Sequence, residues 1–569
     1  MATNTTSLIG DDASTDARRG ARVTCGDTSP RLNIAGSDGG PSDFIIRCAR
    51  QGKLAFGLIV LAGGLTALLL PLSLTRLIDG DEGYLLLAAR LMSEGKIPYR
   101  DFFLTQGPVL PAVFGAWLWA AGRSWAAARI VEGVIAVIMG LFVFRETFAA
   151  TRRCLAAVFA TLLFAFSANT EGWLTIVKGF GLSALFALGS VLLLGAAVVP
   201  SRSIRDNRRT ELATTGAGVC IGLAASTRLY VILVLPALGL YLLRWVGLGR
   251  SGRRRLGGYT LGCLCGLLPL FVSFAIERKA FVFDTLLFHG VREWGQSSLL
   301  GKASDKLPVI QKAVGLHRRA TAEGRQFLVL AVPAVLAMVA RLRARGRYRS
   351  AAGWVWPPLL VGSVLPNPFL QQYLCLLVPF LAVEAGVFLA LLVDCGVHWK
   401  ATMGTTGKHL CDAAVAVSTL ACLAYYLGVG WRERDRYVHT GVDVPGIWSQ
   451  DRTVRWRIET VEGAAREIDS QNQLVAASWW PGYFVSTRTR PVLALANDFG
   501  FRAAEVLSPE ERRGLHVASH ADVGNMIRLR TPRLFVEGNW AARPWAEWLA
   551  DNGFRVQAMV HNVAIWALR

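Results

Sequence analysis

Cysteine is missing from three long segments of the chain, 76–107, 276–325 and 431–569. The ten cysteines lie in the N-terminal tail or in and beside apolar runs, and no two of them have the CxxC spacing typical of metal ligands. A disulfide within or between the three segments is therefore excluded. The last segment also lacks GxGxxG, a P-loop and a nucleophile elbow, so nothing in it indicates a nucleotide-binding or hydrolase domain.

Acidic residues are few compared with basic ones. The chain has 40 Asp and Glu against 61 Lys and Arg, which gives a formal net charge of +21. Many of the arginines cluster in short links between apolar runs, in 202–209, 250–255 and 341–349, as the positive-inside rule describes for cytoplasmic loops. No basic stripe alternates with exposed aromatic residues, so we expect membrane topology and no nucleic-acid partner.

What the chain has in abundance is apolar sequence. It is 53% hydrophobic, its mean hydropathy is +0.39, and the apolar residues fall into blocks of about 20 residues, roughly the length that crosses a bilayer. The sequence therefore predicts a polytopic α-helical membrane protein with about 11–13 spans. The candidate spans are 54–75, 108–122, 127–147, 154–168, 179–199, 212–226, 229–246, 256–275, 326–341, 352–365, 369–394 and 410–430.

The charges of the loops predict which side of the membrane each loop occupies. From 199 onward one arrangement is consistent, with 200–211 and 342–351 inside and 276–325 and 431–569 outside. For the residues before 199, the charge pattern gives no consistent arrangement. With the N-terminus inside, 76–107 lies outside and an odd number of crossings must precede 199, yet four segments are present. Either one of them, such as 108–122, is short or re-entrant, or a boundary is misplaced.

Three regions follow from this reading. Residues 1–52 are polar, and we expect a disordered cytoplasmic tail before a membrane module at 53–430 with outer loops 76–107 and 276–325. Residues 431–569 are expected to form a small extracytoplasmic α/β domain. Its strand-like pieces NQLVAAS, PVLAL, PRLFVEG and NVAIWAL alternate with the helical stretches VRWRIETVEGAAREI and PWAEWLADN.

The segment IDGDEGYLLLAARLMSEGKIPYRDFFLTQGP (78–108) is unusually charged for a position directly after a membrane span. Its part from Asp81 to Gly95 reads as an amphipathic helix that lies along the outer interface, with Glu82, Arg90 and Glu94 on one stripe. Asp81 would stand at the helix start. Residue chemistry leaves two roles open for it, a helix N-cap or an ionised carboxylate that acts as a general base.

The pattern DE-G-Y…A-R…G…PY-D…GP in this segment resembles the first extracytoplasmic loop of GT-C-type membrane glycosyltransferases. The nearest resemblance is to family 39 and related proteins, which include protein O-mannosyltransferases and the aminoarabinose transferases of lipid A. It is motif-specific around 79–110 and weak at 222–236 and 366–380. The resemblance implies that Asp81 is the catalytic base with Glu82 as its partner.

The resemblance also implies candidates for the donor phosphate. Arg228 stands at a helix break in 222–236 where the family often has Thr-Lys or Thr-Arg; the alternative is an interfacial arginine that snorkels. Lys178 is the second candidate, with an interfacial anchor as its alternative. Many family members place an Asp in this neighbourhood, whereas this chain has Glu171 and Lys178, which puts a second catalytic acid in doubt. Arg90 is the third candidate.

Substrate-binding residues are expected in three places. The stretch 98–109 resembles a variant of the motif that is found in many bacterial members of the family. The stretch 366–382 resembles the family's pattern of a polar residue and a tyrosine at the start of a late membrane span. The aromatic belt of a membrane interface would explain the residues of 366–382 equally. In the outer loop 276–325 a tryptophan could stack on a sugar, and a histidine has no second histidine at ligand spacing. No cofactor is therefore expected, and a divalent metal has no support. The candidates are Tyr99, Arg100, Asp101, Gln106, His289, Trp294, Gln372 and Tyr373.

The function that the resemblance implies is that of an inverting glycosyltransferase of the bacterial plasma membrane. It would move a hexosyl or pentosyl group from a polyprenyl-phosphate donor to a hydroxyl of an envelope lipid, glycan or protein. The alternatives are a transporter or lipid flippase, and a relative that binds glycan without transfer. Because the apolar runs contain few acids and show no repeated halves, the enzyme is favoured over the transporter.

Overall fold

The computed structural model describes residues 41–198, 204–288, 299–343, 349–366, 369–402, 405–439, 458–469, 473–477, 480–497, 499–538, 544–561 and 563–568. Its contacts divide the chain into two units, 1–58 and 59–569. In the first unit the described residues belong to helix α1 (Pro41–Thr75), so this helix begins inside the segment expected to be a tail. The expectation for 1–40 concerns residues outside those described.

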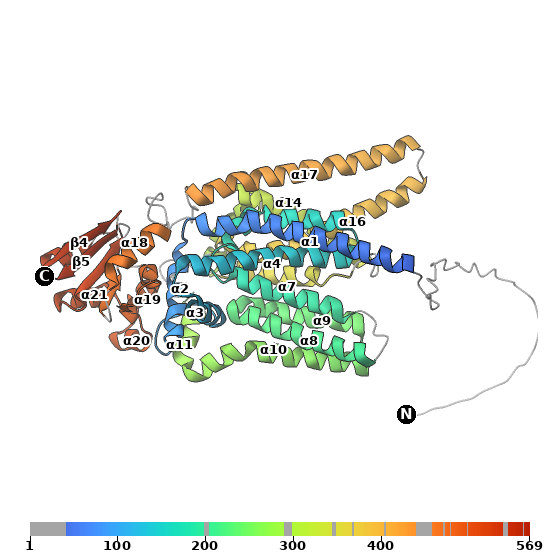
Figure 1. Ribbon diagram of the computed structural model, residues 1–569. Helices are drawn as coiled ribbons and strands as arrows, with labels where there is room; N and C mark the ends of the chain where they lie inside the picture. The colour runs from blue at the N-terminus through green and yellow to red at the C-terminus, as the bar shows by residue number, and fades with distance from the viewer. Residues whose placement is uncertain are drawn as a thin grey trace, which may run out of the picture. The chain divides into compact units, whose positions relative to one another are not determined.

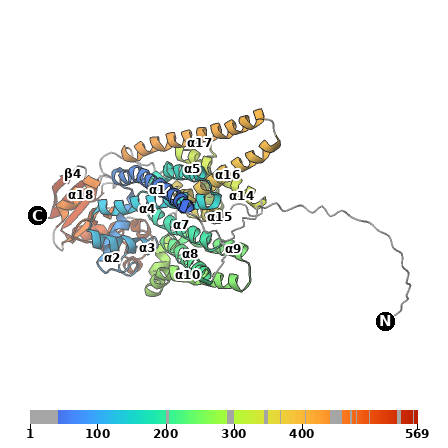
Figure 2. The same cartoon turned by 45° about the vertical axis from the view of Figure 1, so that its right-hand side comes forward.

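Helices make up the membrane module of the second unit. After α1 they are α2 (Gly80–Ser93), α3 (Val109–Ala121), α4 (Trp125–Thr151), α5 (Cys154–Ala165), α6 (Ala168–Trp173), α7 (Phe180–Ala197), α8 (Ile204–Thr227), η1 (Leu229–Leu233), α9 (Val234–Val246), α10 (Arg250–Ile276), α11 (Arg278–Val282), the π-helical η2 (Phe283–Leu287), α13 (Leu299–Ala313), α14 (Ala322–Arg343), α15 (Ala352–Val364), η3 (Gln371–Leu377), α16 (Val378–Thr402) and α17 (Thr405–His439). Helices α7, α8 and α10 pack side by side (Figures 1 and 2).

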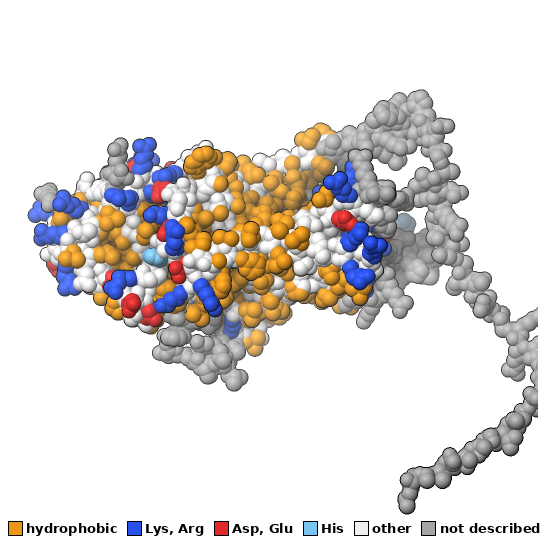
Figure 3. All heavy atoms as spheres, turned by 90° about the horizontal axis from the view of Figure 1, so that it is seen from below, with side chains coloured by type: hydrophobic (Ala, Val, Ile, Leu, Met, Phe, Trp, Pro, Cys, Tyr) orange, Lys and Arg blue, Asp and Glu red, His pale blue; other side chains and the backbone are white. Residues whose placement is uncertain are grey.

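The apolar character of these helices confirms the predicted class. Among the described residues, eight helical segments are long and apolar enough to cross a membrane. Figure 3 shows apolar side chains over the helical part of one face, with Lys and Arg gathered towards either end of it. Such a surface is stable only where lipid covers it, so this is a multi-pass membrane protein. The eight segments are 56–75, 125–151, 180–197, 229–246, 250–276, 322–341, 371–394 and 412–439.

Helix α3 resolves the surplus crossing before residue 199. Its 13 residues reach only about 20 Å at 1.5 Å per residue, too short for a bilayer, and it packs against α2. Helix α4 then leads away from the C-terminal domain, where Trp125 contacts Gly482, to Arg153, which pairs with Asp394 of α16. Helices α5 and α6 return, and α7 leads away again. The short length of α3 agrees with one of the two explanations that the charge pattern left open, that 108–122 does not cross the membrane.

Helix α2 differs from the prediction at its start and in its surroundings. Asp79, not Asp81, is the N-cap: its carboxylate accepts the Asp81 N–H, and Glu82 accepts the Asp79 N–H, which forms a capping box. The helix is also covered by protein, where the prediction had its polar side exposed. From Gly80 to Leu91 every residue except Asp81 is buried, because the C-terminal domain and α4 cover the charged side of the helix.

The C-terminal domain is built on one sheet of order β2-β1-β3-β5-β4, in which β1 pairs in parallel with β2 and β3 and the remaining pairs are antiparallel. The predicted α/β class is confirmed, although 493–495 is a 3₁₀ turn and β4 was not predicted. The strands are β1 (Leu474–Ala477), β2 (Arg490–Pro491), β3 (Leu534–Gly538), β4 (Phe554–Val560) and β5 (Val563–Leu568). The helices are α18 (Ile458–Ile468), α19 (Gly500–Ala504), α20 (Pro509–Gly514), α21 (His520–Arg528) and α22 (Pro544–Asp551), with the 3₁₀ turns η4 (Pro481–Phe484) and η5 (Leu493–Leu495).

The C-terminal domain docks on α2. The Arg90 guanidinium donates to the carbonyl oxygens of Phe484 and Thr489 at 2.6 Å each, and the Trp480 indole donates to the Gly80 carbonyl at 2.9 Å. Gly83 is required at this contact because the indole of Trp480 occupies the place where a Cβ would be. The first turn of α2 is therefore held between the membrane module and the C-terminal domain.

Candidate active site

A cavity of about 400 Å³ lies beside the first turn of α2. It collects side chains that are far apart in the sequence, from α2, the 98–109 loop, the 174–179 segment, η1, η2, η3 and the C-terminal domain. The predicted site residues on its wall are Asp81, Gln106, Lys178, Arg228, Gln372 and Tyr373. The structure thus brings six of the thirteen candidates into one cavity.

The carboxylate that lines this cavity belongs to Asp81. The capping box on Asp79 and Glu82 fixes the start of α2, which leaves Asp81 in the first turn with its side chain on the cavity wall. Its side chain is 16% exposed and its Oδ2 lies 3.0 Å from the Lys178 Nζ. Helix N-termini carry a partial positive charge, so a carboxylate suits this position.

Lys178 is buried among polar partners rather than anchored at the membrane surface. Its Nζ lies 2.6 Å from Asp79 Oδ1 and 2.7 Å from Gln372 Oε1, and 4.7 Å from the centre of the Trp173 ring. Burial alone would lower the pKa of Lys178, but the charges of Asp79 and Asp81 outweigh it and raise the pKa. Conversely, burial acts to raise the pKa of Asp79, while Lys178 and Arg76 hold it below its usual value. Lys178 and Asp79 therefore form a charged pair.

Arg228 stands where α8 ends and η1 begins. Its guanidinium donates to the carbonyl oxygen of Lys178 and lies 3.8 Å above the ring of Phe180. Among the described residues its partners are this carbonyl and this ring, not a carboxylate, and its buried Nε has no hydrogen-bond partner. Within the described part of the chain, no carboxylate is therefore paired with this cation of the cavity.

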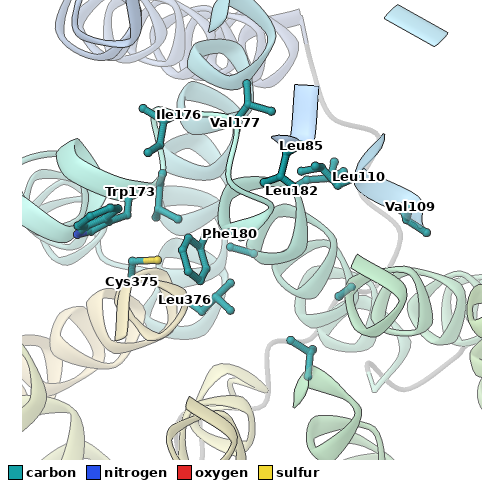
Figure 4. Close-up of a cluster of buried hydrophobic side chains, with 14 of the residues drawn as sticks. Leu85, Val109, Leu110, Trp173, Ile176, Val177, Phe180, Leu182, Cys375 and Leu376 are labelled. Carbon is teal, nitrogen blue, oxygen red and sulfur yellow. The ribbon is translucent and has the colours of Figure 1, made fainter. Parts of the chain in front are cut away.

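The hydrophobic packing beneath the site fixes these two cations. Figure 4 shows Phe180 beside Cys375 and Leu376 of η3, with Trp173 near the same group. Phe180, Trp173 and both η3 residues are buried. Because Lys178 and Arg228 each lie against one of these rings, the core determines where the ammonium and guanidinium can point.

The 98–109 loop positions Gln106 on the cavity wall. Tyr99 has a left-handed backbone (φ 67°), and its hydroxyl donates to the Gln106 carbonyl at 2.6 Å. The Gln106 amide donates to the Tyr84 hydroxyl at 2.8 Å, and its buried Oε1 has no partner among the described residues. Gly107 lies directly against the Ser226 carbonyl with no room for a Cβ, which fixes the loop to the end of α8. Tyr99 thus acts through Gln106 and does not line the cavity itself.

The remaining predicted residues do not line the cavity. Glu82 is buried in an ion pair with Arg129 at 2.6 Å and accepts the Val177 N–H, so it supports the fold beneath Asp81. Arg90 is engaged by the C-terminal domain and by Glu94, which leaves its guanidinium no route to the cavity. Arg100 and Asp101 pair with each other at 3.1 Å, and Asp101 also accepts the Ile97 N–H. His289 and Trp294 lie outside the described residues.

Sequence reasoning missed three residues of the site. Asp79 was readable from the spacing Asp79-x-x-Glu82, which is a capping-box signature, but the cap was considered only as one of two roles for Asp81. Tyr84 also lines the cavity, and it was assigned no role from the sequence. Phe499 comes from the C-terminal domain, where its ring packs 5.6 Å from Tyr84 and 6.3 Å from Phe288. No local pattern could have assigned Phe499 to a site 400 residues earlier in the chain.

The cavity opens through an apolar side. Ile232, Leu286 and Leu365 line it and are 40%, 53% and 62% exposed. Ile232 belongs to the candidate membrane span 229–246, so this side of the cavity adjoins apolar helical surface. Within the described residues no three His, Cys, Asp or Glu side chains are grouped to hold a metal ion.

No protein-family model matches the chain, and no curated protein matches it. Solved structures do. The chain is similar to ArnT from Cupriavidus metallidurans bound to undecaprenyl phosphate (16% identity, TM-score 0.58) and in the apo state (15% identity, TM-score 0.57); each alignment covers 90% of this chain and 98% of that chain. An oligosaccharyltransferase from Archaeoglobus fulgidus in complex with Zn and sulfate aligns over 83% of this chain and 68% of that chain, with 13% identity and a TM-score of 0.49. The two ArnT alignments confirm the predicted GT-C fold.

Proposed function

We propose that this protein is an inverting glycosyltransferase that uses a polyprenyl-phosphate-linked sugar as its donor and a hydroxyl of an envelope lipid, glycan or protein as its acceptor. The observation that carries the proposal is one cavity lined by Asp81, Lys178 and Arg228 and by the exposed apolar side chains of Ile232, Leu286 and Leu365. An ArnT structure of the same fold contains undecaprenyl phosphate, a ligand of the same chemical class.

The reaction requires a base for the acceptor hydroxyl. The acceptor oxygen forms a bond to the anomeric carbon, and the bond from that carbon to the phosphate oxygen breaks. The electron pair of the broken bond stays on the phosphate, and the acceptor proton passes to the Asp81 carboxylate. A single in-line displacement inverts the anomeric centre. No other carboxylate of the described residues lines the cavity, so Asp81 takes this role.

The leaving group requires positive charge rather than an acid. Polyprenyl phosphate departs as an anion, and preorganised cations stabilise the charge that develops on its oxygen. Arg228 and Lys178 supply two cations on the same wall, and Arg228 has no carboxylate partner among the described residues. The apolar side chains of the opening suit the polyprenyl chain. We include no cofactor or metal in the proposed reaction.

The cellular setting is also part of the proposal. The arginine-rich links would lie in the cytoplasm of a bacterial plasma membrane, with the cavity and the α/β domain on the extracytoplasmic side. The 53–430 region would be the catalytic module. Transport is disfavoured because the C-terminal domain contributes Phe499 to the cavity wall and thus covers the route outward.

The direct test is transfer of a labelled sugar. Membranes that carry the full chain are incubated with polyprenyl-phosphate sugars, and label in extracted envelope material is measured. Asp81→Asn is expected to lower transfer by about 100-fold or more, the usual contribution of a general base. Arg228→Ala is expected to weaken donor use more than acceptor use. Asp435→Asn, whose side chain is 76% exposed, serves as the matched control. Near-normal transfer by Asp81→Asn would refute the assignment.

A further inference from the structure

The Lys178 ammonium is surrounded by protein oxygens. It donates hydrogen bonds to Asp79 Oδ1 at 2.6 Å and to Gln372 Oε1 at 2.7 Å, and it forms an ion pair with Asp81 Oδ2 at 3.0 Å. An ammonium group has only three N–H bonds to share among its partners. A phosphate that approaches Lys178 therefore competes with these three oxygens.

Asp79 is the acceptor least able to leave. Its carboxylate also caps α2 by accepting the Asp81 N–H at 3.0 Å, so its departure would cost the capping bond as well. It does not line the cavity, and its side chain is only 8% exposed. A ligand in the cavity cannot readily take its place.

Gln372 and Asp81 both line the cavity, and charge decides between them. The Gln372 amide is neutral, so an arriving phosphate does not repel it. The Asp81 carboxylate has the longest of the three contacts, and a phosphate nearby repels it strongly in a partly buried site. Asp81 is thus the acceptor that an incoming phosphate displaces.

We propose that the donor phosphate exchanges with the Asp81 carboxylate on Lys178, so that Lys178 holds the base in the empty site and releases it when the donor binds. This inference rests on the proposed function and adds to it the order in which the two substrates bind. The donor binds first, because only then is the Asp81 carboxylate available to the acceptor hydroxyl. Arg228 would receive the phosphate next to Lys178, since its guanidinium already lies against the Lys178 carbonyl.

Binding of a polyprenyl monophosphate to the purified full chain tests the exchange without turnover. The wild-type protein is compared with Asp81→Asn, Lys178→Gln and the double variant, and uncharged polyprenol is the control ligand. Because Asp81→Asn removes the competing anion, it is expected to bind polyprenyl phosphate about fivefold to tenfold more tightly, within the range of coupling between contacting residues. Lys178→Gln is expected to bind more weakly, and the gain from Asp81→Asn should disappear in the double variant.

Each outcome bears on the proposal. Unchanged or weaker binding by Asp81→Asn, with a melting temperature like that of the wild type, would overturn the exchange and leave the donor assignment intact. A gain that persists in the double variant would also overturn it, since the effect would not pass through Lys178. If the wild-type protein binds polyprenyl phosphate no better than polyprenol, both the donor assignment and the exchange fail. Asp81→Ala repeats the test if Asp81→Asn does not fold.

Discussion

The indole Nε1 of Trp480 donates a 2.9 Å hydrogen bond to the carbonyl oxygen of Gly80, the residue that precedes Asp81. Trp480 also stacks on Trp125 of α4, with 5.7 Å between the ring centres. One tryptophan of the C-terminal domain therefore contacts both the helix that carries the proposed base and the adjacent membrane helix. Docking of the domain and placement of the carboxylate are coupled through this side chain.

Gly83→Ala tests that coupling. The new methyl group would occupy the space of the Trp480 indole, so the indole must move and its bond to Gly80 must break. We expect the variant to lose about 1–3 kcal/mol of stability, as overpacked sites do, and to transfer sugar more slowly. Thermal unfolding and label transfer measure the two effects.

Gly64→Ala is the matched control for this variant. Gly64 is also helical, and a Cβ there would meet nothing within 4 Å. Since alanine is intrinsically better than glycine in a helix by about 1 kcal/mol, this control should be neutral or slightly stabilised. A Gly83→Ala protein that melts and transfers sugar as Gly64→Ala does would contradict the docking described here.

Phe499→Leu tests whether the C-terminal domain is part of the active site. The Phe499 ring lines the cavity and packs edge-to-face on Tyr84, one turn along α2 from Asp81. Its loss should leave the cavity wall incomplete, and we expect kcat/KM to fall by roughly tenfold, about 1.4 kcal/mol of transition-state stabilisation. Steady-state kinetics with varied donor and acceptor would show which substrate contacts the ring.

Phe501→Leu provides the comparison for Phe499→Leu. Phe501 packs on Trp545 at 5.9 Å and on His520 at 5.4 Å, inside the C-terminal domain and away from the cavity. We expect this variant to lower the melting temperature while kcat/KM stays near the wild-type value. Equal kinetic losses in the two variants would mean that Phe499 acts only through the stability of the domain.

The pH dependence of stability should report the buried cluster around Asp79. Burial acts to raise the pKa of Asp79, but Lys178 and Arg76 lower it below its ordinary value. A depressed pKa in the folded state contributes stability above the unfolded pKa, near 3.9, and this contribution is lost as the pH falls through the folded pKa. Asp79→Asn should therefore unfold more easily than the wild type at pH 7, by about 3–5 kcal/mol for a broken buried pair.

The same variant gives a second, independent readout. The difference in unfolding free energy between Asp79→Asn and the wild type should shrink below about pH 4 and vanish at still lower pH. Asp435→Asn, whose side chain is largely exposed, should show no such pH-dependent difference. A difference that is constant from pH 7 to pH 3 would mean that Asp79 is not held ionised by Lys178.

Much of the fold was predictable because it depends on local sequence. Apolar runs of the length of a bilayer located the membrane helices, and alternation of apolar residues located β1, β3 and β5. The sequence also indicated Asp81 and Arg228, since a charge beside or within apolar sequence is costly without a use. Both line the cavity.

What could not be predicted depends on contacts between distant segments. Arg90 had the right charge for a phosphate ligand, but its guanidinium donates to the carbonyl oxygens of Phe484 and Thr489. The sequence around Arg90 does not indicate this contact with residues about 400 positions later. Lys178 could equally have been a surface anchor until Asp79 and Gln372 were found around it. The polar stripe of α2 suggested exposure to water, whereas the C-terminal domain buries it.

The Phe499 contact has a consequence for how such a protein can diversify. The reacting carboxylate and both cations come from residues 81–228, whereas the cover over them is supplied by a module at the far end of the chain. Under the proposed function, chimeras that keep Trp480 and the carbonyls around Arg90 but exchange the rest of that module would retain the carboxylate and both cations and change only the cover. Selectivity and bond-making chemistry would then be altered separately, by recombination as well as by point substitution.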